Sequence, residues 1–156
     1  GRTTCRDDDA GAAPRNGAKA LPLALSAQMP LHLVILMLGT NDLKPVHGGM
    51  ALSAQAGMRR LAEIVATFPY KPRSALPSLL LVAPPACGAE ARGGRSLAQS
   101  QLLAPLYAAL ATEIGCGFFD AGSVARSSAI DGVHLEAEDS AAIGRALVAP
   151  VLKILG

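Results

Sequence analysis

The stretch "VILMLGTNDLKP", residues 34–45, places bare apolar residues directly against Gly-Thr-Asn-Asp. Together with the preceding "LHL" it forms a near-continuous apolar run with β-branched Val34 and Ile35, which predicts a buried strand covered on both faces. A polar segment at the end of such a strand indicates a ligand or catalytic site, provided that the strand belongs to a parallel sheet. The remaining sequence supports that condition.

Segments of strand and helix character alternate along the chain. The predicted strands are residues 31–38, 78–84 and 116–122. The predicted helices cover about residues 18–28, 49–68, 97–113 and 136–155, with Pro22 early in the first of them. This alternation with short connections predicts βαβ units and a parallel sheet, so the expected fold class is α/β. Residues 85–96, "PACGAEARGGRS", are small, polar and Gly-rich, and predict a mobile loop.

Composition restricts the class of protein. The 156 residues are 51% hydrophobic and 17% charged, which is typical of one globular domain. The net charge is only +2 and the basic residues are scattered, so we expect no nucleic-acid partner. Every apolar run is shorter than the roughly 20 residues of a membrane-spanning helix, so we expect a soluble chain without a membrane partner. The three cysteines, Cys5, Cys87 and Cys116, are far apart, which favours reduced structural thiols.

The candidate chemistry falls on one rim of the predicted sheet. Residues 39–42 follow the first strand, residues 84–87 follow the second, and Asp131 and His134 lie in the loop after the third. Because the carboxyl ends of parallel strands meet at the same edge of a sheet, we expect these groups to lie close together.

The motif "IDGVHL" places Asp131 three residues before His134. In a catalytic reading, Asp131 holds the imidazole of His134 in the tautomer that accepts a proton. A metal site would need further ligands, and the other two histidines have no comparable cluster around them, so we expect no metal. The alternative, ordinary loop residues at a chance spacing, stays open for the pair taken alone.

Gly39 and Asn41 give a second signal of a different kind. Gly39 allows a tight turn and close backbone approach, and the amide of Asn41 can donate to developing negative charge. The alternative is a turn in which Asn41 and Asp42 bond the local backbone. Their position on the same rim as Asp131 and His134 favours the catalytic interpretation.

Several stretches resemble one known family. "LVILMLGTNDLK" and "DGVHL" resemble the third and fifth conserved blocks of the SGNH hydrolases, also called GDSL-type esterases. "RNGAKALP", "VAPP" and "FFDAGSV" are similar to the arylesterase and acyltransferase branch, and the resemblance extends from Gly1 to about Leu147. It implies a three-layer α/β/α flavodoxin-like sandwich, no metal or other cofactor, and a Ser-His-Asp mechanism on small acyl or aryl esters.

The resemblance also implies roles for individual residues. His134 is the general base, Asp131 its orienting partner and Asn41 a donor of the oxyanion hole. "GRTT" resembles the second block, so Gly1 would give a backbone N–H to the same oxyanion, which requires the natural chain to continue upstream. Thr40 and Pro85, on the same rim, are the predicted substrate-binding residues.

The chain departs from the family pattern at the nucleophile. The family's serine lies in a Gly-Asp-Ser block well before the position of Gly1, and no serine here has that context, including Ser123, Ser127 and Ser128. We therefore expect residues 1–156 to be a single domain from the carboxy-terminal part of an esterase, without its N-terminal strands. Ala20 stands where the nearest family members carry an aromatic residue.

A noncatalytic ester- or carbohydrate-binding relative that has lost the serine is the alternative function. The expected partner is a small-molecule ester, and a homo-oligomer is left open. No signal peptide is visible, which leaves the location unknown with a slight preference for the cytoplasm.

Overall fold

Three parallel strands form the centre of the molecule. The computed structural model describes residues 1–8, 13–71 and 75–156. The strands are β1 (Leu33–Leu36), β2 (Ser78–Ala83) and β3 (Gly117–Asp120), hydrogen-bonded in the order β1-β2-β3. Ile35 pairs with Leu80, and Leu81 pairs with Phe118. The parallel sheet predicted from the alternation of elements is confirmed.

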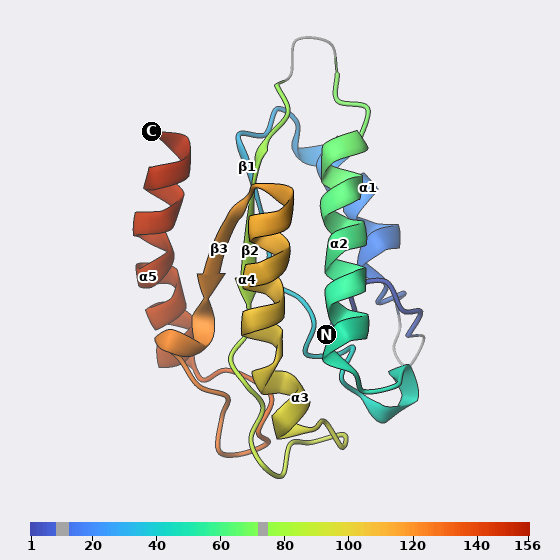
Figure 1. The fold of residues 1–156 in the computed structure, drawn as a ribbon, viewed down its shortest axis with the longest axis vertical. Coiled ribbons are helices and arrows are strands. Elements are labelled where there is room, and N and C mark those ends of the chain that lie inside the picture. The colour runs from blue at the N-terminus through green and yellow to red at the C-terminus, as the bar shows by residue number, and fades with distance from the viewer. Residues whose placement is uncertain (9–12, 72–74) are drawn as a thin grey trace.

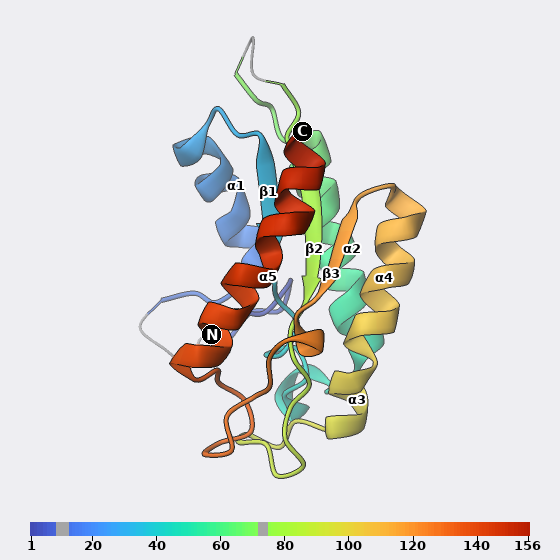
Figure 2. The ribbon, with the colours of Figure 1, turned by 90° about the vertical axis from the view of Figure 1, so that its left-hand side faces the viewer.

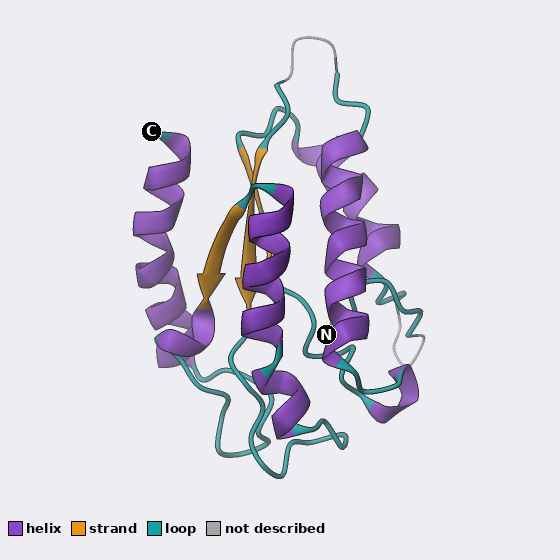
Figure 3. Cartoon of the chain, in the orientation of Figure 1, coloured by secondary structure: helices purple, strands orange, loops and turns teal. Residues whose placement is uncertain are grey.

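Helices cover the sheet from both sides. They are α1 (Gly17–Gln28), α2 (Ala51–Thr67), α3 (Leu97–Gln101), α4 (Leu103–Ile114) and α5 (Ala137–Leu155), with 3₁₀ turns η1 (Pro45–His47) and η2 (Ala121–Ser123). α5 lies on one face of the sheet, and α2 and α4 lie on the other, with α1 against α2 (Figures 1 and 2). The colouring by element in Figure 3 shows these three layers, which confirm the α/β/α flavodoxin-like sandwich. Across the described residues, no helix combines the length and the apolar character that crossing a membrane requires.

Two helices that contain proline have different bounds in the structure from those predicted. The helix expected over residues 97–113 is divided into α3 and α4 at Leu102. Pro105 lacks a backbone N–H, which is tolerated in a first helical turn, and it lies in the first turn of the restarted helix. Pro22, expected early in its helix, is the sixth residue of α1 because the helix already begins after the N-cap Asn16, whose side chain accepts from the Lys19 N–H.

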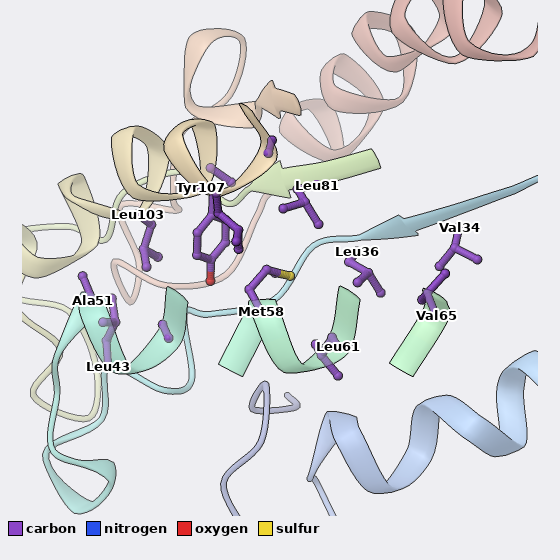
Figure 4. Packing of buried hydrophobic residues seen from close by; sticks show 14 of the residues in the cluster. Val34, Leu36, Leu43, Ala51, Met58, Leu61, Val65, Leu81, Leu103 and Tyr107 are labelled. Carbon is purple, nitrogen blue, oxygen red and sulfur yellow. The ribbon is translucent and has the colours of Figure 1, made fainter. Parts of the chain in front are cut away.

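The main core lies between the sheet and the helices α2 and α4. Met58, Leu61 and Val65 recur along one face of α2 and contact the buried side of β1 and β2 (Figure 4). Tyr107 of α4 is completely buried, and its hydroxyl donates to the Leu38 carbonyl at 3.0 Å. A smaller cluster on the other face joins Leu80 and Val82 to Ile143 of α5. Hydrophobic packing on both faces of the sheet, together with the Tyr107 hydrogen bond, therefore fixes the carboxyl ends of the strands.

β1 is covered on one face and largely open on the other. Val34 and Leu36 are buried toward α2, whereas Ile35 is 42% exposed and Met37 is 40% exposed. The prediction of a strand covered on both faces is therefore wrong for β1. The reason is that α5 packs on β3 and β2, while β1 lies at the edge of the sheet.

Candidate active site

The turn after β1 is built around Gly39, where any other residue would be strained. Gly39 has φ +128°, and a Cβ there would lie 2.3 Å from the Tyr107 hydroxyl oxygen. The Asp42 N–H donates to the Gly39 carbonyl at 3.0 Å and closes the turn. The side chains of residues 40–42 are therefore free to bond elsewhere.

Asp42 anchors the beginning of the chain. Its buried carboxylate accepts from the Thr4 N–H at 2.9 Å and from the Thr4 hydroxyl at 2.5 Å. Burial raises the pKa of Asp42, and the hydrogen bonds from Thr4 act in the opposite direction. Besides a hydrogen bond from its own backbone N–H, the Asp42 carboxylate therefore has a partner that lies far away in sequence.

Asn41 lies between the first residues of the chain and the loop after β2. Its Nδ2 donates to the Arg2 carbonyl at 3.3 Å, and its Oδ1 accepts from Arg95 Nη2 at 2.6 Å. A Cβ added to Gly1 would lie 2.9 Å from Asn41 Nδ2, so Gly1 is in close contact with the amide. The structure thus brings Gly1 and Asn41 together, and it adds Arg95, which the sequence did not single out.

Asp131 and His134 form a hydrogen-bonded pair. Asp131 Oδ2 bonds Nδ1 of the imidazole, while Oδ1 accepts from the backbone N–H groups of Val133 and His134, each at 2.9 Å. The bond to the His134 ring, followed by these two N–H groups, holds the pKa of Asp131 well below its usual range. The His134 side chain is 75% exposed. This geometry orients the ring through Nδ1 and leaves Nε2 facing solvent, as a general base requires.

The loops after β2 and β3 cross in direct backbone contact. The Gly88 N–H donates to the Gly132 carbonyl and the Arg92 N–H donates to the Asp131 carbonyl, both at 2.8 Å. Gly132 has φ +67°, and a Cβ there would lie 3.0 Å from the Ala91 Cα. The loop expected to be mobile is therefore tied to the backbone that carries Asp131.

The serines near the rim that the structure describes are not placed as nucleophiles. The hydroxyls of Ser123, Ser127 and Ser128 donate to the Asp120 carbonyl, the Ala86 carbonyl and the Glu136 carboxylate respectively. Cys87 is buried, which raises the pKa of its thiol and keeps it protonated. Within residues 1–8, 13–71 and 75–156, no cluster of three metal-ligating side chains occurs.

The two predicted substrate-binding residues have different surroundings. Thr40 is half-buried, and its carbonyl accepts from Arg95 Nε at 2.9 Å. Pro85 is buried, and its Cα would lie 3.7 Å from a Cβ at Gly122 in the turn after β3. Its neighbour Pro84 lines a hollow of about 470 Å³ at this end of the sheet. Ala20 lines a separate apolar hollow of about 400 Å³ beside β1.

Known structures match this chain over almost its whole length. A protein of Agrobacterium tumefaciens, provisionally described as an arylesterase, is 66% identical with a TM-score of 0.97, and the match covers 99% of this chain and 76% of that one. A carbohydrate acetylesterase family member from Sinorhizobium meliloti is 43% identical with a TM-score of 0.95 and the same coverage. The aryl esterase of M. smegmatis is 36% identical with a TM-score of 0.88, over 99% of this chain and 75% of that one.

No protein-family model and no curated protein matches the sequence. The family is shown by the three solved structures, which are 36–66% identical to this chain and match 99% of it. The α/β/α fold agrees with this assignment. The chain belongs to the SGNH hydrolase family, in the branch of the arylesterases and carbohydrate acetylesterases.

Proposed function

We propose that the protein containing residues 1–156 hydrolyses small acyl and aryl esters through a Ser-His-Asp mechanism, with the serine supplied from upstream of Gly1. The observation that supports this most directly is the Asp131–His134 pair, whose imidazole is oriented at Nδ1 and open to solvent at Nε2. The arylesterases and carbohydrate acetylesterases among the similar structures agree with an ester substrate.

Each residue has one task in this reaction. The serine Oγ attacks the carbonyl carbon of the ester while His134 Nε2 takes the hydroxyl proton. Asn41 Nδ2, with the backbone N–H at Gly1, donates to the oxygen that becomes negatively charged. The proton on His134 then passes to the departing alkoxide, which leaves as an alcohol.

The second half of the reaction repeats these steps with water. Water loses a proton to His134 and attacks the acyl-serine, and the carboxylic acid leaves as the serine recovers its proton. An alcohol in place of water would give acyl transfer. Thr40 and Pro85 are the proposed contacts to the substrate, at the ends of β1 and β2.

An aryl acetate assay on three proteins tests the proposal. They are residues 1–156, the His134→Ala variant of this chain, and the complete protein expressed with the residues encoded upstream. Because no described serine near the rim is oriented toward His134, we expect no serine-dependent turnover from either of the first two proteins, which should be alike. The weak hydrolysis of activated esters by a free imidazole is therefore not counted as triad activity. The complete protein should be faster by roughly four to six orders of magnitude, because the members of a triad act as a unit.

Two outcomes contradict the proposal. A complete protein without turnover that depends on His134 would favour the noncatalytic ester- or carbohydrate-binding alternative. An acyl-enzyme that forms on Ser127 or Ser128 of the unextended chain, and is lost in His134→Ala, would place the nucleophile inside residues 1–156.

A further inference from the structure

Arg95 is a buried cation whose hydrogen-bond partners within the described part of the chain are neutral oxygens. It ends the loop between β2 and α3, and it is 8% exposed. Its guanidinium donates to the Thr40 carbonyl at 2.9 Å, to Asn41 Oδ1 at 2.6 Å and to the Arg92 carbonyl. The ion pairs of the described residues do not include Arg95. A guanidinium buried without a carboxylate partner lowers stability, so the position of Arg95 points to a role other than stabilising the fold.

The chemistry of the two side chains determines how the Asn41 amide is turned. A guanidinium has five N–H donors and no acceptor, so the atom that faces Arg95 must be the carbonyl oxygen Oδ1. This conclusion depends on the donor inventory rather than on how amide oxygen and nitrogen are assigned. The opposite end of the amide, Nδ2, therefore faces Gly1 and the Arg2 carbonyl.

The turned amide points its donor toward the proposed oxyanion site. Gly1, which would supply the second donor, has no space for a side chain on the Nδ2 side of Asn41. A positive charge at Oδ1 also polarises the amide, which makes its N–H groups stronger donors to negative charge. Fixed dipoles of this kind stabilise a transition state because they need no reorganisation during the reaction.

The Arg95 side chain also connects Asn41 of the proposed oxyanion hole with the loop that carries Asp131 and His134. The Arg92 carbonyl accepts from Arg95, and the Arg92 N–H donates to the Asp131 carbonyl at 2.8 Å. A short path of hydrogen bonds therefore runs from Asn41 to the residue that orients His134.

We propose that Arg95 is a positioning residue of the oxyanion hole, which holds the Asn41 carboxamide with its Nδ2 toward the substrate oxygen. This inference rests on the proposed ester hydrolysis and adds a residue that acts through Asn41. Arg95 touches no reacting atom.

A double-mutant cycle in the complete protein tests the inference. The variants are Arg95→Met, Asn41→Ala and the combination of both, with kcat and KM measured on an aryl acetate. We expect Arg95→Met to lower kcat by about 10- to 100-fold, less than the roughly 10²- to 10³-fold loss on removing an oxyanion donor, with KM changed by less than about threefold. In the Asn41→Ala background the same substitution should change kcat by less than about twofold, because its target is already gone.

Two further variants serve as controls. Arg59→Met removes another hydrogen-bonded arginine, the partner of Glu113 on the surface between α2 and α4, and should keep the wild-type kcat. Arg95→Lys keeps the charge but loses the planar fork, so it should recover only part of the kcat lost in Arg95→Met. If Arg95→Met does not fold, the cycle is run with Arg95→Lys in its place.

The outcomes separate this inference from the proposed function. If wild-type complete protein shows no turnover that depends on His134, both are rejected. If the wild type is active and the two substitutions lower kcat independently, or if Arg95→Met changes only KM, the proposed function stands and the role of Arg95 is overturned.

Discussion

At the residue scale, the hydrogen bonds from Thr4 are the largest contribution that favours the buried Asp42 carboxylate. Burial already raises its pKa, so the ionised form is disfavoured in the folded state compared with the unfolded chain. Below pH 3.8, the ordinary pKa, Asp42 is protonated in both states and costs no unfolding free energy. As the pH rises from 3.8 toward the higher pKa of Asp42 in the folded state, the unfolding free energy decreases. Weaker hydrogen bonds from Thr4 would make this decrease in unfolding free energy larger.

Thr4→Val keeps the shape of the side chain and removes the hydroxyl donor. We expect the complete protein to lose about 1–3 kcal/mol of unfolding free energy at pH 7 and less at pH 4, where protonation removes the buried charge. Urea unfolding at the two pH values measures this difference. Thr112→Val is the matched control, since the exposed Thr112 hydroxyl bonds its own helix at Ala108, and it should change stability by less than about 0.5 kcal/mol. An equal loss at both pH values would contradict the assigned role of the carboxylate.

Sequence reasoning located residues whose partners are close along the chain. Asp131 and His134 are three residues apart, so one loop was enough to predict their hydrogen bond. Arg95 was missed because its partner Asn41 is 54 positions away, and a lone arginine in a Gly-rich loop usually remains in water. One feature of the sequence could have indicated Arg95. It directly precedes Ser96, the N-cap of α3, and a residue at that point lies where the loop packs against the rest of the protein again.

At the scale of elements, the two loops that carry the site are kept together by glycines. A Cβ on Gly88 would lie 3.0 Å from the Gly132 Cα, and a Cβ on Gly132 would lie 3.3 Å from the Gly88 Cα, so a side chain on either residue would push the loops apart. The sequence predicted the strands, the helices and their common rim because apolar periodicity is local. It did not predict the crossing of these loops, which depends on contact between segments more than 40 residues apart, as with the Gly88 N–H and the Gly132 carbonyl.

Gly132→Ala should separate the loops and displace Asp131 and His134. The added methyl would meet the Ala91 Cα at 3.0 Å, and the residue would keep φ +67°, so we expect a loss of about 1–3 kcal/mol and a lower kcat in the complete protein. Thermal unfolding and the aryl acetate assay measure the two effects.

Gly144→Ala is its counterpart inside α5. Nothing lies within 4 Å of the added Cβ, so this change should stabilise the protein by about 0.5–1 kcal/mol and leave kcat unchanged. Equal behaviour of the two glycine variants would show that the loop crossing does not constrain the site.

At the scale of the whole molecule, the edge of the sheet at β1 determines how residues 1–156 behave alone. Ile35 and Met37 are exposed beside backbone groups of an edge strand, and such edges pair with other chains. The apolar run at residues 31–38 predicted the strand but could not show which face a helix covers, because coverage depends on where α5 docks.

We expect residues 1–156, expressed without upstream residues, to associate through this edge. Ile35→Lys places a charge on the open face and should shift the population toward monomer, whereas Ile130→Lys, at an 88% exposed loop position, should not. Size-exclusion chromatography with light scattering measures the masses. A wild-type chain that is monomeric and unfolds cooperatively would contradict this expectation.

The contacts of Asn41 also fix an order of events during protein synthesis. Its amide is held between Arg2, made before it, and Arg95, made 54 residues later. At a typical elongation rate of roughly 5–20 residues per second, the asparagine waits for several seconds before the arginine that orients it has been added. The segment between them contains α2 and β2, and the packing of these two elements brings Asn41 and Arg95 together. The oxyanion donor therefore cannot take its final orientation before Arg95 has been added, and the Asp131–His134 pair, which comes later in the chain, completes the site.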